Sequence, residues 1–354
     1  MFTFFVGGII VLGKILLGLA LTGISLAIMA MIANAIFSKQ LPPRQRIQLT
    51  DGRIMEGPDK ILGEGAFGAV HQYQLENKPV AVKMPKDAKY EALQKHELIL
   101  LKKANPHAQI ISLIAEARVN HTTWIITEFM RGSLRDLLDN LPNLSWKTKL
   151  SIAIQIVTGV MHLHNLSQGI FEKEVIVHQD LKPENILVDR FENTPDIKAK
   201  IGDFGIAKEV HALTIPILGT TIASGVVRGA EGGTLNYAAP ETAKALIKGK
   251  GTSGPKCDIF SIGIILWELA TGRKPHRTED EVLAGRFDEF VEEEQQHRRP
   301  HTKKSFFGSV TQTTTPTYPQ CGFFGPLIKS CIAPKPEKRN TAIELLHKLE
   351  QLSI

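Results

Sequence analysis

The pattern of hydrophobic residues changes near Met130, and this change limits the possible fold more than any other feature. Before it, the chain has short β-rich runs, at residues 60–74, 78–84, 110–119 and 122–129. Between the second and third runs, residues 89–104 place Leu93, Leu98 and Leu101 on one helical face. The first part of the chain therefore predicts a small sheet with one helix.

Beyond Met130 the long segments have helical periodicity. The longest, residues 145–166, has four apolar residues at helical spacing, Leu150, Ile154, Val157 and Met161. Further helical stretches cover residues 256–272 and 341–352, and the polar, aperiodic residues 292–319 predict an exposed loop. No internal repeat is present, which argues against a solenoid or propeller. The pattern predicts an α+β protein with two lobes, at about residues 54–130 and 131–354.

The N-terminal segment differs from the rest of the chain. Residues 15–37 carry no charge, and as a helix they would reach about 34 Å, enough to cross a bilayer core of about 30 Å. A cleaved signal peptide is the alternative, but the apolar run is too long and no basic region precedes it.

The charges that flank this segment predict its orientation. One lysine, Lys14, precedes the uncharged run, whereas four basic residues follow it, Lys39, Arg44, Arg46 and Arg53. By the positive-inside bias, we expect a single-pass membrane anchor at residues 1–37, a basic juxtamembrane linker at 38–53 and a cytosolic folded domain at 54–354.

Composition argues against two classes of function. The formal net charge of +6 is spread over alternating acidic and basic stretches without a basic stripe interleaved with aromatic residues, so we expect no nucleic-acid partner. The three cysteines have no CxxC spacing and no histidine cluster nearby, which suits a reducing compartment and argues against a disulfide framework or a zinc site.

Residues 63–70, GEGAFGAV, have the form G-x-G-x-x-G-x-V between two predicted strands. Glycines let a backbone close over phosphates, whose oxygens the N–H groups can then face. A Rossmann site would need a helix after the last glycine, whereas VHQYQ continues as a strand. The motif alone does not distinguish a phosphate-binding loop from an ordinary glycine-rich hairpin.

Three further segments supply groups suited to phosphoryl transfer. Lys83 ends the strand sequence VAVK, and Glu97 on the following helix can fix its position, although an isolated pair of this kind is better explained as a solvated surface ion pair. HQDLKPEN supplies Asp180 and Asn185, and GDFG supplies Asp203. Phosphoryl transfer needs magnesium across the phosphates, an aligned hydroxyl and a carboxylate to accept its proton. These residues cover those requirements.

The order and spacing of these motifs resemble the eukaryotic-type protein kinase family over about residues 55–354. The resemblance continues through EGGTLNYAAPE, which contains Thr234 and Glu241, through Asp258 in DIFSIGIILWEL, and through Arg339 in PEKRNTA. It implies a bilobal kinase fold in which Asp258 braces the catalytic loop through backbone N–H groups and Arg339 pairs with Glu241.

The resemblance also implies a role for each site residue. Asp180 would accept the proton of the substrate hydroxyl, Lys182 would steady the γ-phosphate, and Lys83, paired with Glu97, would contact the other phosphates of ATP. Asn185 and Asp203 would hold Mg²⁺, with Mn²⁺ as an alternative. The remaining ATP-binding residues would be Gly63, Glu64, Gly65, Ala66, Phe67, Gly68, Val70, Ala81, Thr127, Glu128, Met130 and Leu187.

Within this set, Thr127 would be the gatekeeper beside the adenine, and backbone groups of Glu128 and Met130 would bond the adenine edge. His178 and Phe204 are expected to be packing residues rather than chemical ones.

The residues after Asp180 indicate the substrate class. LKPEN resembles the serine/threonine kinases, in which Lys182 works with Thr234, and this implies protein substrates with Ser or Thr hydroxyls. The segment ITEFMRGSL also resembles the tyrosine-kinase-like branch of serine/threonine kinases, so dual specificity is an alternative. A pseudokinase scaffold is the other alternative, which the presence of all the catalytic residues opposes. The protein substrate and the oligomeric state are left open.

One residue departs from the family pattern, because Gln179 occupies the place of the usual arginine between His178 and Asp180. That arginine commonly pairs with a phosphorylated residue of the activation segment, and a neutral glutamine cannot replace this ion pair. We therefore hypothesise that the segment, with hydroxyls at Thr214, Thr220, Thr221 and Ser224, orders by its own apolar packing. The alternative is that Lys208 or Arg228 replaces the arginine.

Overall fold

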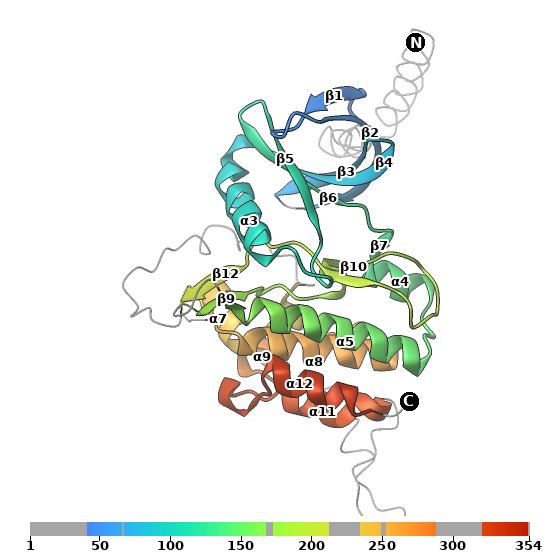
Figure 1. Ribbon diagram of the computed structural model, residues 1–354. Helices are drawn as coiled ribbons and strands as arrows, with labels where there is room; N and C mark the ends of the chain where they lie inside the picture. The colour runs from blue at the N-terminus through green and yellow to red at the C-terminus, as the bar shows by residue number, and fades with distance from the viewer. Residues whose placement is uncertain are drawn as a thin grey trace, which may run out of the picture.

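The computed structural model describes residues 41–65, 67–167, 173–211, 234–248, 253–287 and 321–352. Within them the chain forms two lobes (Figure 1). A sheet and one helix make up the smaller lobe, and the larger lobe is mainly helical, so the two-lobed α+β fold predicted from the hydrophobic pattern is confirmed.

A six-stranded antiparallel sheet forms the small lobe, in the order β1-β2-β3-β4-β6-β5. The strands are β1 Gln45–Gln48, β2 Ile54–Glu64, β3 Gly68–Leu75, β4 Lys78–Pro85, β5 Leu113–Val119 and β6 Thr122–Glu128. Alternate residues of three central strands, among them Tyr73, Val80, Val82 and Ile126, fill a hydrophobic core on one face. The other face is left for functional side chains.

Helix α3, Glu91–Ala104, follows the short 3-10 turn η1 Ala88–Tyr90. Its buried residues Leu98, Leu100, Leu101 and Ala104 belong to the large hydrophobic cluster that fills the second lobe. Leu93, predicted for the same face, is only half-buried. The helix packs against β6 of its own lobe, and through these residues the hydrophobic cluster continues from the small lobe into the large one.

The large lobe is built around helix α8, in which every residue from Cys257 to Ala270 is buried. The helix is buried all round because it lies at the centre of the lobe, with α5 and α11 packed against it. Gly272 ends α8 with a φ of 72°. The helices are α4 Leu134–Asn140, α5 Trp146–Leu163, α7 Pro240–Lys248, α8 Lys256–Thr271, α9 Glu279–Ala284, α11 Gly325–Cys331 and α12 Ala342–Glu350.

Two small three-stranded sheets lie where the lobes meet (Figure 1). The first consists of β7 Gly132–Ser133, β10 Ile186–Val188 and β11 Ala199–Ile201, and the second of β8 Leu166–Ser167, β9 Lys173–Val177 and β12 Lys208–His211. The connections between their strands carry Asp180, Asn185 and Asp203, so these sheets position the predicted catalytic residues. The other 3-10 turns are η2 Pro183–Asn185, η4 Thr234–Tyr237, η5 Gly322–Phe324 and η6 Pro336–Lys338.

The N-terminal predictions require correction. Residues 45–48, predicted as part of the linker, form β1, because pairing with β2 satisfies their backbone groups and buries Ile47. The anchor at residues 1–37 and the loop at 292–319 lie outside the described residues. Among the helices that the structure describes, none is long and apolar enough to cross a membrane. The single-pass membrane location predicted from the sequence is therefore withdrawn.

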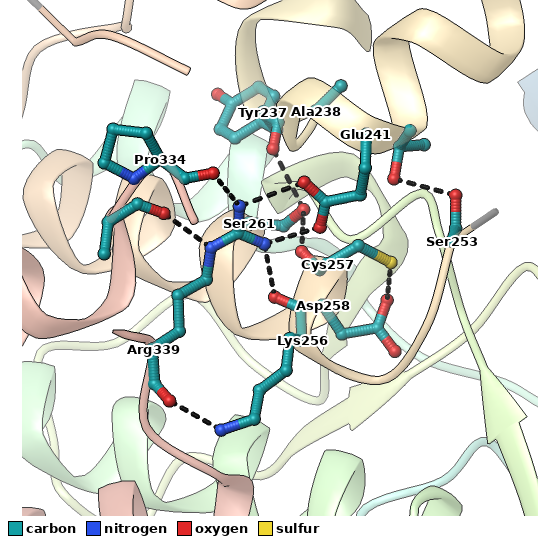
Figure 2. Close-up of polar contacts among 12 residues, drawn as sticks. Tyr237, Ala238, Glu241, Ser253, Lys256, Cys257, Asp258, Ser261, Pro334 and Arg339 are labelled. Atoms are coloured by element: carbon teal, nitrogen blue, oxygen red, sulfur yellow. Dashed lines mark hydrogen bonds and ion pairs between the residues drawn. The ribbon is translucent and has the colours of Figure 1, made fainter. Parts of the chain in front are cut away.

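Arg339 ties the C-terminal part of the large lobe to α7 (Figure 2). Its buried guanidinium contacts Glu241 at 2.6 Å through Nη1 and at 3.0 Å through Nη2. It also donates to the carbonyls of Ala333 at 2.7 Å, Lys256 at 2.9 Å and Pro334 at 3.1 Å. The Arg339–Glu241 pair implied by the family resemblance is present.

We expect Arg339→Met to lower the free energy of unfolding by roughly 3 to 5 kcal/mol, because it leaves the Glu241 carboxylate and three carbonyls without their donor. Arg339→Lys should recover only part of this loss, since an ammonium cannot reproduce the two-pronged contact. Urea unfolding followed by circular dichroism measures the change. The exposed neighbour Lys338→Met is the control, and an Arg339→Met variant as stable as this control would contradict the prediction.

Candidate active site

Lys83 on β4 connects the two lobes through its side chain. Its Nζ lies 2.7 Å from both carboxylate oxygens of Glu97 on α3 and 2.8 Å from Oδ1 of Asp203, which follows β11. Gln94, one turn before Glu97 on α3, donates to the Lys83 carbonyl at 3.0 Å. One ammonium therefore joins a strand, a helix and a loop that are far apart in the sequence.

Lys83 and Asp203 stabilise each other's charge, whereas burial raises the pKa of Glu97. Burial alone would lower the pKa of Lys83, but the carboxylates of Asp203 and Glu97 outweigh burial and raise it. The Lys83 ammonium in turn lowers the pKa of Asp203. Lys83 and Asp203 thus both remain charged at neutral pH, and the cluster presents a cation beside a carboxylate.

Strand register places four of the predicted ATP-binding residues on one face of the sheet. Val70 lies opposite Lys83, and Ala81 lies opposite Thr127. Residues directly opposite in an antiparallel pair share a face, and Ala81 and Lys83 are two positions apart on β4. This face is the one that the hydrophobic core of the small lobe does not occupy. Leu187, from the large lobe, lies on β10 between the buried residues Ile186 and Val188 and is half-buried.

The glycine-rich loop connects β2 to β3. The Gly65 N–H donates to the Gly68 carbonyl at 2.9 Å, which closes the turn. A Cβ atom at Gly68 would lie 2.5 Å from the Met84 carbonyl oxygen, so only glycine allows β3 and β4 to approach this closely. Around Gly63, in contrast, no heavy atom of the described residues lies within 4 Å of the Cβ position. Space beside the loop is therefore open where a larger group could lie.

Side-chain contacts on either side hold the loop in place. Glu64 pairs with Lys86 at 2.8 Å, and the ring of Phe67 packs edge-on against Tyr90 with centroids 5.5 Å apart. Ala66, also predicted as an ATP-binding residue, lies outside the described residues.

The connection between the lobes contains the residues predicted to bond adenine. The Glu128 N–H donates to the Ser112 carbonyl at 3.0 Å, so an adenine contact at this residue would have to use its carbonyl. The Glu128 carboxylate accepts from the Ser112 N–H at 2.7 Å and from Lys200 Nζ at 2.5 Å. Met130 is buried.

Asp180 and Asn185 lie on the connection between β9 and β10. Lys182 Nζ is 2.8 Å from Asp180 Oδ2, and Asn185 Nδ2 donates to the Asp180 carbonyl at 2.7 Å and to Oδ2 at 2.9 Å. These contacts leave Asn185 Oδ1 as the atom suited to a metal. Burial raises the pKa of Asp180, against the opposing effect of the Lys182 charge. The Thr234 side chain, implied as a partner of Lys182, lies outside the described side chains.

The buried carboxylate of Asp258 holds the connection between β9 and β10 through hydrogen bonds to its backbone. It accepts from the backbone N–H of His178 at 2.9 Å and of Gln179 at 2.8 Å, and His164 Nε2 donates to it at 2.9 Å. Gln179 has a φ of 67°, which is unfavourable for a residue with a side chain. The brace implied for Asp258 is therefore present, and it stabilises a strained backbone.

His178 and Phe204 pack together, with ring centroids 5.3 Å apart. His178 Nε2 also donates to the Gly202 carbonyl at 3.0 Å, and the Gly202 N–H donates to the Asn185 carbonyl at 2.9 Å. The expected packing role of both rings agrees with these contacts, which fix the Asp203 segment against the catalytic loop.

Three polar residues near the site were not among those predicted, namely Gln94, Ser112 and Lys200. Gln94 could have been found, because it lies three residues before Glu97 on a predicted helix and therefore on the same face. Ser112 and Lys200 carry no local signal, since their partner Glu128 is distant in the sequence.

Comparison with known proteins is consistent with this geometry. A family model described as protein kinase domain matches residues 58–349. The receptor protein kinase WSS1 of Oryza sativa subsp. japonica is 35% identical over 228 residues, which cover 61% of this chain and 22% of that protein. A probable serine/threonine-protein kinase of Dictyostelium discoideum is 34% identical over 227 residues, or 61% of this chain and 19% of that protein.

A third relative is the calmodulin-binding receptor-like cytoplasmic kinase 3 of Arabidopsis thaliana, which is 32% identical over 250 residues, or 65% of this chain and 43% of that protein. The chain thus spans less than half the length of these three relatives.

We expect Asp258→Asn to raise amide hydrogen exchange at His178 and Gln179 by about tenfold or more, because an amide nitrogen replaces one of the accepting oxygens and the strained turn opens more often. Hydrogen–deuterium exchange with mass spectrometry of the peptides that cover these residues measures the effect. Asp139→Asn, an exposed position, is the control. Unchanged exchange in Asp258→Asn would show that the brace does not hold the loop.

Proposed function

Because the chain belongs to the protein kinase family, we propose that it is an active serine/threonine protein kinase that transfers the γ-phosphate of Mg-ATP to Ser or Thr hydroxyls of proteins. The observation that carries this proposal is the assembled set of charged groups, with Lys83 in contact with Glu97 and Asp203, and Asp180 in contact with Asn185. In a pseudokinase scaffold, the alternative, we would expect one of these groups to be missing or held apart.

The residues present suit Mg-ATP. Open space beside Gly63 and the Lys83 ammonium suit the phosphates, and the Asp203 carboxylate, 49% exposed, and the Asn185 amide oxygen are the kind of ligands that Mg²⁺ prefers. Mn²⁺ accepts the same ligands. When bound, Mg-ATP supplies the phosphoryl group and neutralises part of its charge.

The chain's own groups would act on the substrate hydroxyl. Lys182 and Asn185 both engage Oδ2 of Asp180, so Oδ1 is the oxygen that we expect to accept the hydroxyl proton. Lys182 would then steady the transferred group as a nearby cation. The sequence around Lys182 and the name of the Dictyostelium relative support Ser and Thr as acceptors, and dual specificity is the alternative.

We expect Lys83→Met and Asp203→Asn each to reduce phosphate transfer to a generic basic protein by about a hundredfold or more, because each removes a charge that the transition state requires. Transfer from radiolabelled ATP measures the rate, and phosphoamino-acid analysis separates Ser and Thr from Tyr. Lys78→Met, at the exposed end of the same strand, is the matched control.

Two outcomes would contradict the activity proposal. One is transfer that survives both substitutions. The other is a wild-type protein that binds nucleotide and transfers nothing, which would favour the scaffold.

We further propose that this activity does not need a phosphate on the activation segment. The Gln179 side chain is 7% exposed, and its Nε2 has no hydrogen-bond partner among the described residues. A neutral amide at this place cannot pair with a phosphate as an arginine would. The strained Gln179 backbone is instead held by Asp258, which needs no modification.

Phosphatase-treated protein should therefore phosphorylate an exogenous Ser/Thr peptide at an initial rate within about threefold of the untreated protein, since no catalytic group depends on the modification. Mass spectrometry of the treated sample verifies the loss of phosphate. A hundredfold loss that returns on rephosphorylation would mean that phosphate orders the segment without the arginine.

A further inference from the structure

Lys103, near the C-terminal end of α3, joins three elements of the fold. Its Nζ lies 2.8 Å from Glu209 Oε2 on β12, and 3.3 and 3.4 Å from the two carboxylate oxygens of Glu174 on β9. The side chains are 25%, 18% and 8% exposed for Lys103, Glu209 and Glu174. This contact is therefore shielded from water and differs from an ordinary surface ion pair.

The strand register explains why a cation is needed here. β9 and β12 are antiparallel, with Glu209 opposite Ile176 and His211 opposite Glu174. Glu174 and Glu209 are therefore diagonal neighbours on one face, about 7–8 Å apart at their Cα atoms. Lys103 offsets the repulsion between the two carboxylates across the strand pair. Burial lowers the pKa of Lys103, but Glu209 and Glu174 outweigh it and raise the pKa.

The same helix contacts the segment after Asp203 at a second place. His96, next to Glu97, donates from Nε2 to the Ala207 carbonyl at 3.0 Å. Ala207 directly precedes β12, and in Figure 1 the C-terminal half of α3 lies above β12 and β9. Helix α3 thus contacts this segment through both His96 and Lys103.

Apolar packing and these polar contacts both constrain α3. Leu98, Leu101 and Ala104 pack in the hydrophobic cluster that the two lobes share, and α3 contacts β6 of its own lobe. Burial of this apolar face sets the rotation of the helix about its axis, and the directional contacts of His96 and Lys103 refine that orientation. That orientation determines whether Glu97 reaches Lys83.

We propose that Lys103 is a positioning residue for phosphoryl transfer, which holds α3 against β12 so that Glu97 and Asp203 both stay on Lys83. This inference rests on the proposed kinase activity and extends it. This ion pair is built from side chains of the fold and requires no modification.

In phosphatase-treated full-length protein, Lys103→Met should lower kcat by about tenfold, and Lys103→Arg should restore it to within about threefold. Glu209→Gln should lower kcat as well. The double variant Lys103→Met with Glu209→Gln should lose no more than Lys103→Met alone, because both changes break the same contact. Lys102→Met is the matched control, since this neighbour is 52% exposed and pairs with Glu116 on β5 at 2.8 Å.

Hydrogen exchange provides a measurement that does not depend on catalysis. We expect the amides of β12 to exchange faster in Lys103→Met than in the wild type or in Lys102→Met. Unchanged exchange at β12, wild-type kcat in Lys103→Met, or a kcat loss that equals the unfolded fraction at the assay temperature would each overturn the positioning role. A wild-type protein without transfer would instead refute the proposed function, whatever the exchange experiment shows.

Discussion

The ammonium of Lys83 is the contact on which the arrangement of both lobes depends. Glu97 and Asp203 lie on different elements and carry the same charge, so without Lys83 they would repel each other. Each carboxylate is useful only if its own element is held in place. For α3 the contacts of Gln94, His96 and Lys103 serve this purpose, and for Asp203 the hydrogen bonds of its neighbour Gly202 do so.

The catalytic loop is anchored differently, on an element that cannot move independently of the core. Asp258 lies in the first turn of α8, whose residues are buried on every side, and its carboxylate binds the N–H groups of His178 and Gln179. The strain of the Gln179 backbone is thus offset by hydrogen bonds to a charged group in a water-free setting. Arg339 and Glu241 fix α7 to the same end of α8, where Arg339 also binds the Lys256 carbonyl.

Much of the fold could be predicted, because its long helices are strongly periodic and have clear ends. α8 was predicted to within a residue, and Ser145 and Thr341 cap α5 and α12 at their expected starts. The apolar face of α5 was assigned less well. Leu150, Ile154 and Met161 are half-buried, whereas Ile152, Ile156 and Val160 are buried, because α5 packs against β11, α8 and α12 on several sides. β1 was missed because only Ile47 and its pairing distinguish it from a polar linker.

The site residues likewise fall into those that the sequence predicts and those that it does not. Asp180, Asn185 and Asp203 lie in short motifs whose spacing is visible in one dimension, whereas Lys103 and Lys200 act only through partners that the fold brings together. Gln179 connects the two cases. The sequence shows that Gln179 replaces the usual arginine. The effect of this replacement depends on which other charged groups hold the segment after Asp203. Among the described residues, Lys103 on α3 pairs there with Glu174 on β9 and Glu209 on β12. Under the proposed role of Lys103, this ion pair orders the segment after Asp203 without a modification of the activation segment.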